Sequence, residues 1–142
     1  MPHEDCIFCK IIQGEIPSAK VYEDDHVYAF LDISQVTKGH TLVIPKTHTE
    51  NIYETPAEVA KELFARVPKI ANAIKDAYNP VGINLLNNNG KQAYQSVFHL
   101  HIHLIPRYGQ EDGFSLNWDA RPEEYTSEDL QQIASDINAN VN

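Results

Sequence analysis

Long apolar runs and clusters of basic residues are both missing from this chain of 142 residues. No stretch approaches the roughly 20 consecutive apolar residues that a membrane-spanning helix needs, so we expect no membrane partner. The formal net charge is −9, and the 11 lysines and arginines are scattered along the chain. Nucleic acids are bound through clustered positive charge, so we expect no nucleic-acid polymer as a partner. A small phosphorylated ligand stays compatible, because backbone N–H groups can hold one phosphate without a basic surface.

The chain also lacks internal repeats, low-complexity tracts and linkers that would divide it. It has neither a G-x-G-x-x-G sequence nor a Walker loop, which argues against the βαβ nucleotide-binding folds. Its composition, with 42% hydrophobic and 22% charged residues, is that of an ordinary globular protein. A chain of this length suits one core, so we predict a single domain over residues 1–142.

Cysteine is scarce, because only Cys6 and Cys9 are present, in a C-x-x-C arrangement. Residues 1–5 are polar and acidic, so we expect no secretory signal and place the protein in the cytoplasm. A structural disulfide is rare in that reducing compartment. Three interpretations of the pair stay open, namely a redox pair, half of a zinc site, or two reduced thiols.

Short apolar segments bounded by turn-forming residues predict five strands. These segments are residues 20–22, 26–31, 40–44, 81–86 and 96–105. The first two flank a turn-prone stretch and are expected to form a hairpin. One long helical segment falls between the third and fourth strands. We therefore predict an α+β fold with a five-stranded antiparallel sheet, one main helix and a short C-terminal helix.

The main helix has a recognisable start at Thr55-Pro56-Ala57-Glu58, with Thr55 as the expected cap. Apolar residues at helical spacing continue to Tyr78 and predict one buried face. Pro68 is expected to bend this helix or to end its first half. Residues 6–17 predict a short helix or turn, and Ser127 is expected to cap the C-terminal helix.

Three histidines alternate with apolar residues in the predicted fifth strand. His99, His101 and His103 occupy every second position, so their side chains share one face. The intervening residues and Phe98 are expected on the other face. Three protonated imidazoles in a row would repel one another, so most are expected to be neutral near pH 7. A neutral imidazole can act as a nucleophile or bind a metal, so the row indicates phosphoryl or acyl transfer through a histidine, or a metal site. The alternative is a half-exposed strand that carries histidines without a function.

Amide and hydroxyl side chains gather in residues 87–96, directly before the histidine row. Amides in loops commonly form turns. Beside neutral histidines they are also suited to donate hydrogen bonds to phosphate oxygens or to a leaving group. Two further histidines, His40 and His48, stand at the head of the third predicted strand and just past its end.

These motifs resemble those of the histidine triad (HIT) family of nucleotide hydrolases and transferases. The resemblance spans roughly residues 5–108 and leaves 109–142 as a C-terminal tail. It rests on residues 7–12, 31–34 (Leu-Asp-Ile-Ser), 39–45 (Gly-His-Thr-Leu-Val-Ile-Pro), 95–97 (Gln-Ser-Val) and the alternating histidines. It implies a HIT-like fold. The chain departs from some members at Tyr94, where they have glycine.

The resemblance implies that His101 attacks the α-phosphate of a nucleoside phosphoramidate or a dinucleoside polyphosphate. Water would then hydrolyse the nucleotidyl-histidine intermediate, since covalent catalysis divides one difficult step into two easier ones. By the same resemblance His103 contacts phosphate oxygens, Gln95 assists the leaving group, and His40 supports the triad. The alternative is a nucleotide-binding regulatory module with little turnover, which would use the same pocket.

The resemblance also implies which residues bind a purine nucleotide. Asp32 matches the position that accepts hydrogen bonds from ribose hydroxyls, while Asn88, Gln95 and Ser96 match positions near the phosphate. The implied walls of the base pocket are Ile7, Phe8, Ile11, Phe30, Leu31 and Ile33. By residue type alone, each of these six could equally belong to the core.

The cysteine pair fits a structural zinc site in this framework. Some HIT proteins carry the same pair, and C-x-x-C spacing lets two thiolates bind one tetrahedral metal. His48 follows the third predicted strand and His99 lies in the fifth, so both can lie near one end of the sheet. We predict a structural zinc ion on Cys6, Cys9, His48 and His99 and no organic cofactor; two reduced thiols are the alternative.

The resemblance further implies a homodimer with a two-fold axis and a continuous sheet, and two-fold dimers are the commonest oligomers. The main helix and the fourth strand carry apolar residues that one small sheet does not fully cover. Trp118 lies in the loop-rich tail and is expected to reach the partner subunit or its site.

Overall fold

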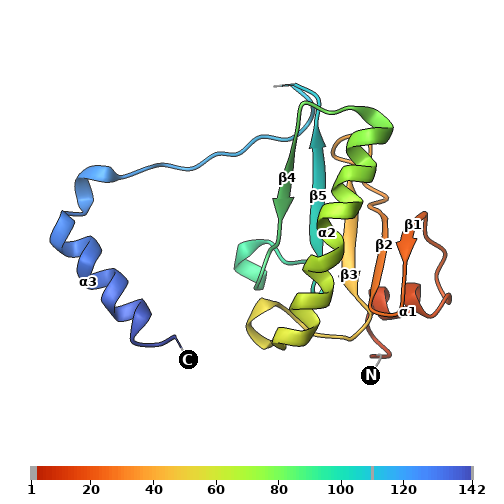
Figure 1. Cartoon of the computed structure of the whole chain (residues 1–142), viewed down its shortest axis with the longest axis horizontal. Coiled ribbons are helices and arrows are strands. Elements are labelled where there is room, and N and C mark those ends of the chain that lie inside the picture. Colours follow the sequence, from red (N-terminus) through yellow and green to blue (C-terminus); the bar gives the residue numbers. More distant parts are fainter. Residues whose placement is uncertain (1–2, 110, 142) are drawn as a thin grey trace.

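The computed structural model describes residues 3–109 and 111–141, and its strands form one antiparallel sheet in the order β1-β2-β3-β5-β4 (Figure 1). The strands are β1 (Lys20–Glu23), β2 (Val27–Leu31), β3 (Thr41–Pro45), β4 (Gly82–Leu86) and β5 (Ile102–Arg107). The α-helices are α1 (Ile7–Ile12), α2 (Ala57–Tyr78) and α3 (Ser127–Asn138). The predicted α+β fold is confirmed, with its five strands, one main helix and a short C-terminal helix.

The sheet buries both of its faces, because alternate residues of a strand point to opposite sides. On one face, Ala29 of β2 belongs to the same buried cluster as Leu63 of α2. On the other face, Phe30 of β2 packs against Phe8 of α1, with ring centroids 5.4 Å apart. The short helix α1 therefore covers the face opposite the long helix α2, and this is the face toward which the histidines turn.

The fifth strand begins later than predicted, since β5 starts at Ile102 and not at residue 96. In the segment before β5, the Leu100 N–H donates to the Thr49 carbonyl at 2.8 Å, and the His101 carbonyl accepts from the Asn87 side chain at 3.0 Å. Side chains still alternate between the two faces before β5 begins, because Leu100 lies in the same buried cluster beneath α2 as Ile102. Phe98, which was expected on the same face as Leu100, is 41% exposed and is not part of the buried cluster.

The main helix also differs from its prediction at two points. Pro56 occupies the N-cap position without a capping hydrogen bond, while the Thr55 hydroxyl donates to the Asn51 carbonyl at 2.7 Å. The helix continues through Pro68 to Tyr78, so Pro68 does not end its first half. Pro68 lies on the exposed side, where water can pair with the carbonyl that loses its donor.

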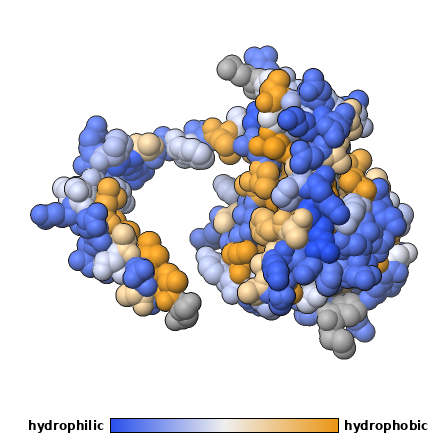
Figure 2. Space-filling view, viewed as in Figure 1, coloured by the Kyte–Doolittle hydropathy of each residue, from blue (hydrophilic) through white to orange (hydrophobic). Residues whose placement is uncertain are grey.

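The C-terminal helix α3 stands apart from the sheet at the end of an extended segment (Figure 1). Thr126, and not Ser127, caps it, through reciprocal hydrogen bonds between Thr126 and Asp129. The apolar stripe of α3 is exposed, and Figure 2 shows apolar side chains both on α3 and on the facing flank of the domain. Trp118 in the linking segment is 77% exposed. No helix within residues 3–109 and 111–141 is long and apolar enough to cross a membrane.

Candidate active site and metal centre

An apolar cavity of about 300 Å³ lies between α1, the end of β2 and the segment that leads into β5. All six predicted base-pocket walls line it, namely Ile7, Phe8, Ile11, Phe30, Leu31 and Ile33. Asp32, Ser96, His101 and His103 line it as well, so the predicted polar groups meet these apolar walls. Five residues that were not predicted also line the cavity, namely Ile16, Pro17, Ser18, Leu42 and Val97. Leu42 could have been found, because it alternates with His40 and therefore shares its face.

His101 is buried at this cavity with one ring nitrogen free to react. Its Nδ1 lies 2.7 Å from the His99 carbonyl, which can only accept, so Nδ1 carries the proton and Nε2 keeps its lone pair. Burial lowers the pKa of His101, so the ring is neutral near pH 7 and nucleophilic. The ring of Phe8 meets it edge to face, with centroids 5.1 Å apart, and holds it in place.

His103 and His40 form a hydrogen-bonded pair beside His101. His40 Nε2 lies 2.9 Å from His103 Nδ1, so the structure joins His40 to the triad. Burial lowers the pKa of both rings, and burial together with the neighbouring histidines brings the pKa of His103 to about 4. Asp32 Oδ2 lies 3.7 Å from His40 Nε2, and these three side chains form one of two groups with metal-ligating potential in the described residues.

Gln95 and Asn88, which were predicted to lie near the phosphate, are not among the residues that line this cavity. Gln95 is 3% exposed, and its side chain accepts from the Gly90 N–H at 2.8 Å. It also donates to the carbonyls of Glu50 and Val97 at 2.7 and 3.0 Å. Gln95 therefore holds the loop that presents Ser96 and does not itself face the cavity.

Tyr94 adopts a left-handed backbone conformation, with φ of 71° and ψ of 21°. Glycine enters that region without steric cost, which explains why a glycine suits this position in similar sequences. Tyr94 adopts this conformation although its own Cβ crowds the backbone there, and its side chain is 85% exposed. Tyr94 therefore occupies a backbone conformation that glycine adopts more readily.

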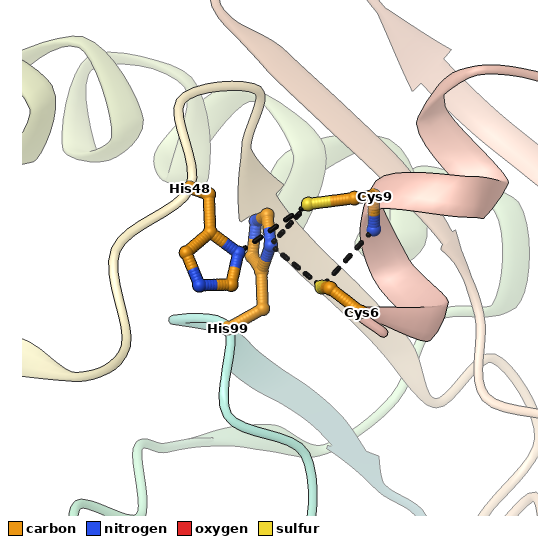
Figure 3. A group of neighbouring side chains, drawn as sticks. All are labelled: Cys6, Cys9, His48 and His99. Carbon is orange, nitrogen blue, oxygen red and sulfur yellow. Dashed lines mark hydrogen bonds between the residues drawn. The ribbon is translucent and has the colours of Figure 1, made fainter. Parts of the chain in front are cut away.

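The four predicted metal ligands converge at one end of the sheet (Figure 3). The ligand atoms of Cys6, Cys9, His48 and His99 all lie within 4.8 Å of one another. Cys9 Sγ is 3.3 Å from His48 Nδ1, and Cys6 Sγ is 3.3 Å from His99 Nδ1. His99 Nε2–H donates to the Pro45 carbonyl at 2.8 Å, which leaves Nδ1 bare and aimed at the thiols.

Burial sets the protonation of this Cys₂His₂ group. It raises the pKa of the Cys6 thiol to about 11, with Cys9 adding to the rise, and lowers the pKa of His99 to about 4. Near pH 7 Cys6 is therefore a thiol and His99 a neutral imidazole. His48 stacks on His3 with ring centroids 3.7 Å apart, and burial, followed by the charge of His3, lowers the pKa of His48. A divalent cation would draw the protons from the thiols, and two sulfurs with two nitrogens complete a tetrahedral shell.

Comparison with known proteins relates this geometry to a family. The sequence profile of the HIT domain matches residues 13–110. The protein named hit of Bacillus subtilis is 66% identical over 134 residues, which cover 94% of this chain and 92% of that protein. An adenosine 5'-monophosphoramidase of Schizosaccharomyces pombe is 38% identical over 136 residues, which cover 96% of this chain and 98% of that protein.

Solved structures agree with the fold. The crystal structure of a HIT family member from Bacillus subtilis matches with a TM-score of 0.95 and 64% identity, over 98% of this chain and 99% of that chain. A zinc-bound histidine triad family protein from Mycobacterium smegmatis matches with a TM-score of 0.72 and 37% identity, over 96% of this chain and 98% of that chain. The resemblance drawn from the sequence motifs is confirmed: the chain belongs to the HIT family.

Proposed function

We propose that this chain hydrolyses the phosphorus–nitrogen bond of adenosine phosphoramidates and related purine nucleotides. The observation that carries the proposal is the bare Nε2 of a neutral, buried His101 at the wall of an apolar cavity. The name of the Schizosaccharomyces pombe relative, an adenosine 5'-monophosphoramidase, supports the choice of bond. A cavity of about 300 Å³ with mostly apolar walls suits a nucleoside, and Asp32 in its lining suits ribose hydroxyls.

The proposed reaction has two displacements at the α-phosphorus. His101 Nε2 attacks, the bond from phosphorus to the leaving nitrogen breaks, and that nitrogen takes up a proton from solvent and departs as an amine. Water then attacks the phosphorus of the nucleotidyl-histidine and gives one proton back to solvent, which releases the nucleotide and restores the ring. Ser96 and His103 line the cavity beside His101 and would donate hydrogen bonds to phosphate oxygens as charge develops on them. Dinucleoside polyphosphates would react by the same attack, with a nucleotide as the leaving group.

A second function, nucleotide binding without turnover, is compatible with the cavity alone. The experiment that separates the two is incubation with an adenosine phosphoramidate and measurement of AMP release by chromatography. We expect His101→Ala to lose at least about a thousandfold in rate while AMP binding survives, because the cavity walls remain. His26→Ala is the matched control, since His26 is an exposed histidine outside the cavity.

Two outcomes would contradict His101 as the nucleophile, and a third would contradict the enzyme assignment. Retention of more than about a tenth of the wild-type rate by His101→Ala would exclude His101 as the nucleophile. Mass spectrometry that finds the nucleotide attached to another histidine would do the same. Wild-type protein that binds AMP but releases none from the phosphoramidate would favour the regulatory module.

We also propose that Cys6, Cys9, His48 and His99 hold a structural zinc ion. Support comes from the converging ligand atoms, from the Cys₂His₂ donor set, and from the zinc named for the Mycobacterium smegmatis protein. All four positions would be filled by protein, so the ion would have no open site for chemistry. Its effect would be to hold α1 against the segment that carries His99. A helix of six residues is too short to be stable alone, and α1 supplies Ile7, Phe8 and Ile11 to the cavity.

A homodimer is the third part of the proposal. β4 is an edge strand of the sheet, and Leu85 on it is 50% exposed. Phe64 of α2 and Trp118 of the tail are 44% and 77% exposed. Exposed apolar residues on these elements suit an interface with a second copy, with the tail reaching across. Sedimentation at micromolar concentration should give twice the chain mass of 16.1 kDa, and a monomer would refute the dimer.

A further inference from the structure

The loop from residue 32 to residue 40, which joins β2 to β3, is closed by the side chain of Gln35. Its Nε2 donates to the carbonyls of Asp32 and His40 at 2.6 and 2.7 Å. Its Oε1 accepts from the Gly39 N–H at 2.8 Å. Carbonyls accept and an amide N–H donates, so these three partners fix the orientation of the amide group. Gln35 therefore ties together the two ends of the loop, one of which carries Asp32 and the other His40.

The same loop determines where the proton of His40 sits. The Val36 N–H donates to His40 Nδ1 at 3.3 Å, so Nδ1 is bare and the proton of the neutral ring is on Nε2. That Nε2–H lies 2.9 Å from His103 Nδ1 and 3.7 Å from the nearer Asp32 oxygen. Only the first distance is that of a hydrogen bond, so His40 donates to His103.

The proton of His103 follows from this chain of contacts. Because His103 Nδ1 accepts from His40, the neutral His103 ring carries its proton on Nε2. His103 lines the cavity next to His101, with ring centroids 5.0 Å apart. In this tautomer His103 offers an N–H to a phosphate oxygen, whereas the other tautomer would face that oxygen with a lone pair.

We propose that Gln35 is a positioning residue for the reaction. By closing the loop, it holds the Val36 amide against His40 and thereby keeps the proton of His103 on Nε2. Gln35 itself does not line the cavity, and its action passes through the backbone of the loop and the His40 ring. The role rests on the proposed function, since it supplies the donor that a nucleotide phosphate would meet.

The experiment compares wild-type protein with Gln35→Met, which keeps the length of the side chain and removes all three hydrogen bonds. Long-range proton–nitrogen NMR of the imidazole rings identifies which nitrogen of each histidine carries the proton. Gln35→Glu is a second variant, because it keeps the acceptor for Gly39 and removes both donors. Gln13→Met is the matched control at an exposed glutamine outside the cavity.

In the wild type we expect one tautomer for both rings, with His40 and His103 protonated on Nε2. In Gln35→Met we expect a second tautomer at His103, with kcat for the phosphoramidate lower by about tenfold and KM changed less than about twofold. We expect kcat to fall more than KM changes because an imidazole in the wrong tautomer weakens the contact with the transition state more than it weakens substrate binding. Gln13→Met should match the wild type in both measurements.

Three results would overturn the inference. The first is a wild-type spectrum with the His40 proton on Nδ1. The second is an unchanged His103 tautomer in both Gln35 variants, whatever kcat does, because Gln35 would then only brace the loop. The third is failure of both variants to fold, which would make its role one of global stability. If the wild type releases no AMP at all, the proposed function fails, while the NMR result still decides the role of Gln35.

Discussion

Cys9→Ser is expected to abolish zinc-dependent stabilisation of the protein while leaving the chemistry at His101 largely intact. Cys9 is 2% exposed, and its Sγ lies 3.3 Å from His48 Nδ1 and 3.6 Å from His99 Nδ1. Serine occupies nearly the same space, so the substitution removes one zinc ligand with little change in packing. The His101 proton stays on Nδ1, because its acceptor is the backbone carbonyl of His99.

The magnitude follows from the linkage between metal binding and folding. Free zinc at 100 times its dissociation constant stabilises the native state by about 2.7 kcal/mol. In a chain of this size each kcal/mol shifts the melting temperature by roughly 2–4 °C, so the wild type should gain about 5–11 °C on zinc loading. Cys9→Ser should gain little, because three ligands bind the ion far more weakly than four.

The assay is a thermal melt of each protein after dialysis against a chelator, with and without added zinc, accompanied by elemental analysis. Without metal the two proteins should melt at similar temperatures, which controls for packing. An equal zinc-induced shift in both proteins would refute the assignment of Cys9 as a ligand. Fewer than about 0.2 zinc ions per chain in wild-type protein purified without chelator would refute the site itself.

Two further predictions concern residues that brace the site and the sheet. Gln95→Ala leaves the Gly90 N–H and two carbonyls without their partner, so it should lower the free energy of unfolding by about 1–3 kcal/mol. Urea titration measures this free energy, and an unchanged value would refute the bracing role. Asp112 accepts two hydrogen bonds from Arg107, and this pairing lowers the pKa of Asp112 below its unfolded value of about 4. The charged Asp112 therefore stabilises the fold above about pH 4, and this stabilisation is lost as the pH falls further. In Asp112→Asn the melting temperature should fall less steeply with pH below about pH 4 than in the wild type. The same fall in both proteins would contradict this prediction.

The directions of side chains were predictable from the sequence, whereas their hydrogen-bond partners were not. Period-two alternation needs only an extended backbone, so the faces of Leu100 and His101 came out correctly although β5 begins after them. Gln95 bonds to a carbonyl 45 positions away, and no local pattern specifies such a partner. The same limit applies to Thr55, whose hydroxyl turns back to Asn51 and not forward to the helix.

The cavity walls were predicted from family motifs and not from residue types, because an apolar residue in a wall and one in the core look alike in a sequence. Phe8 shows why, since it packs against Phe30 of the core and also lines the cavity. The role of Gln35 was not predictable from the sequence for a different reason. It is exposed and matches no motif, and only the folded loop brings its amide to three backbone groups at once.

His101 and His103 differ in how easily a mutation elsewhere can change which ring nitrogen carries the proton. The proton of His101 is held by a backbone carbonyl, and every amino acid placed at position 99 would still supply that carbonyl. The proton of His103 depends on the side chain of His40, which a single base change can replace. Substitutions of neighbouring side chains would therefore disturb the tautomer of His103, the proposed phosphate donor, more readily than that of His101, the proposed nucleophile. A variant that has lost His40 should still keep Nε2 of His101 unprotonated, so the proposed reaction should continue at a lower rate.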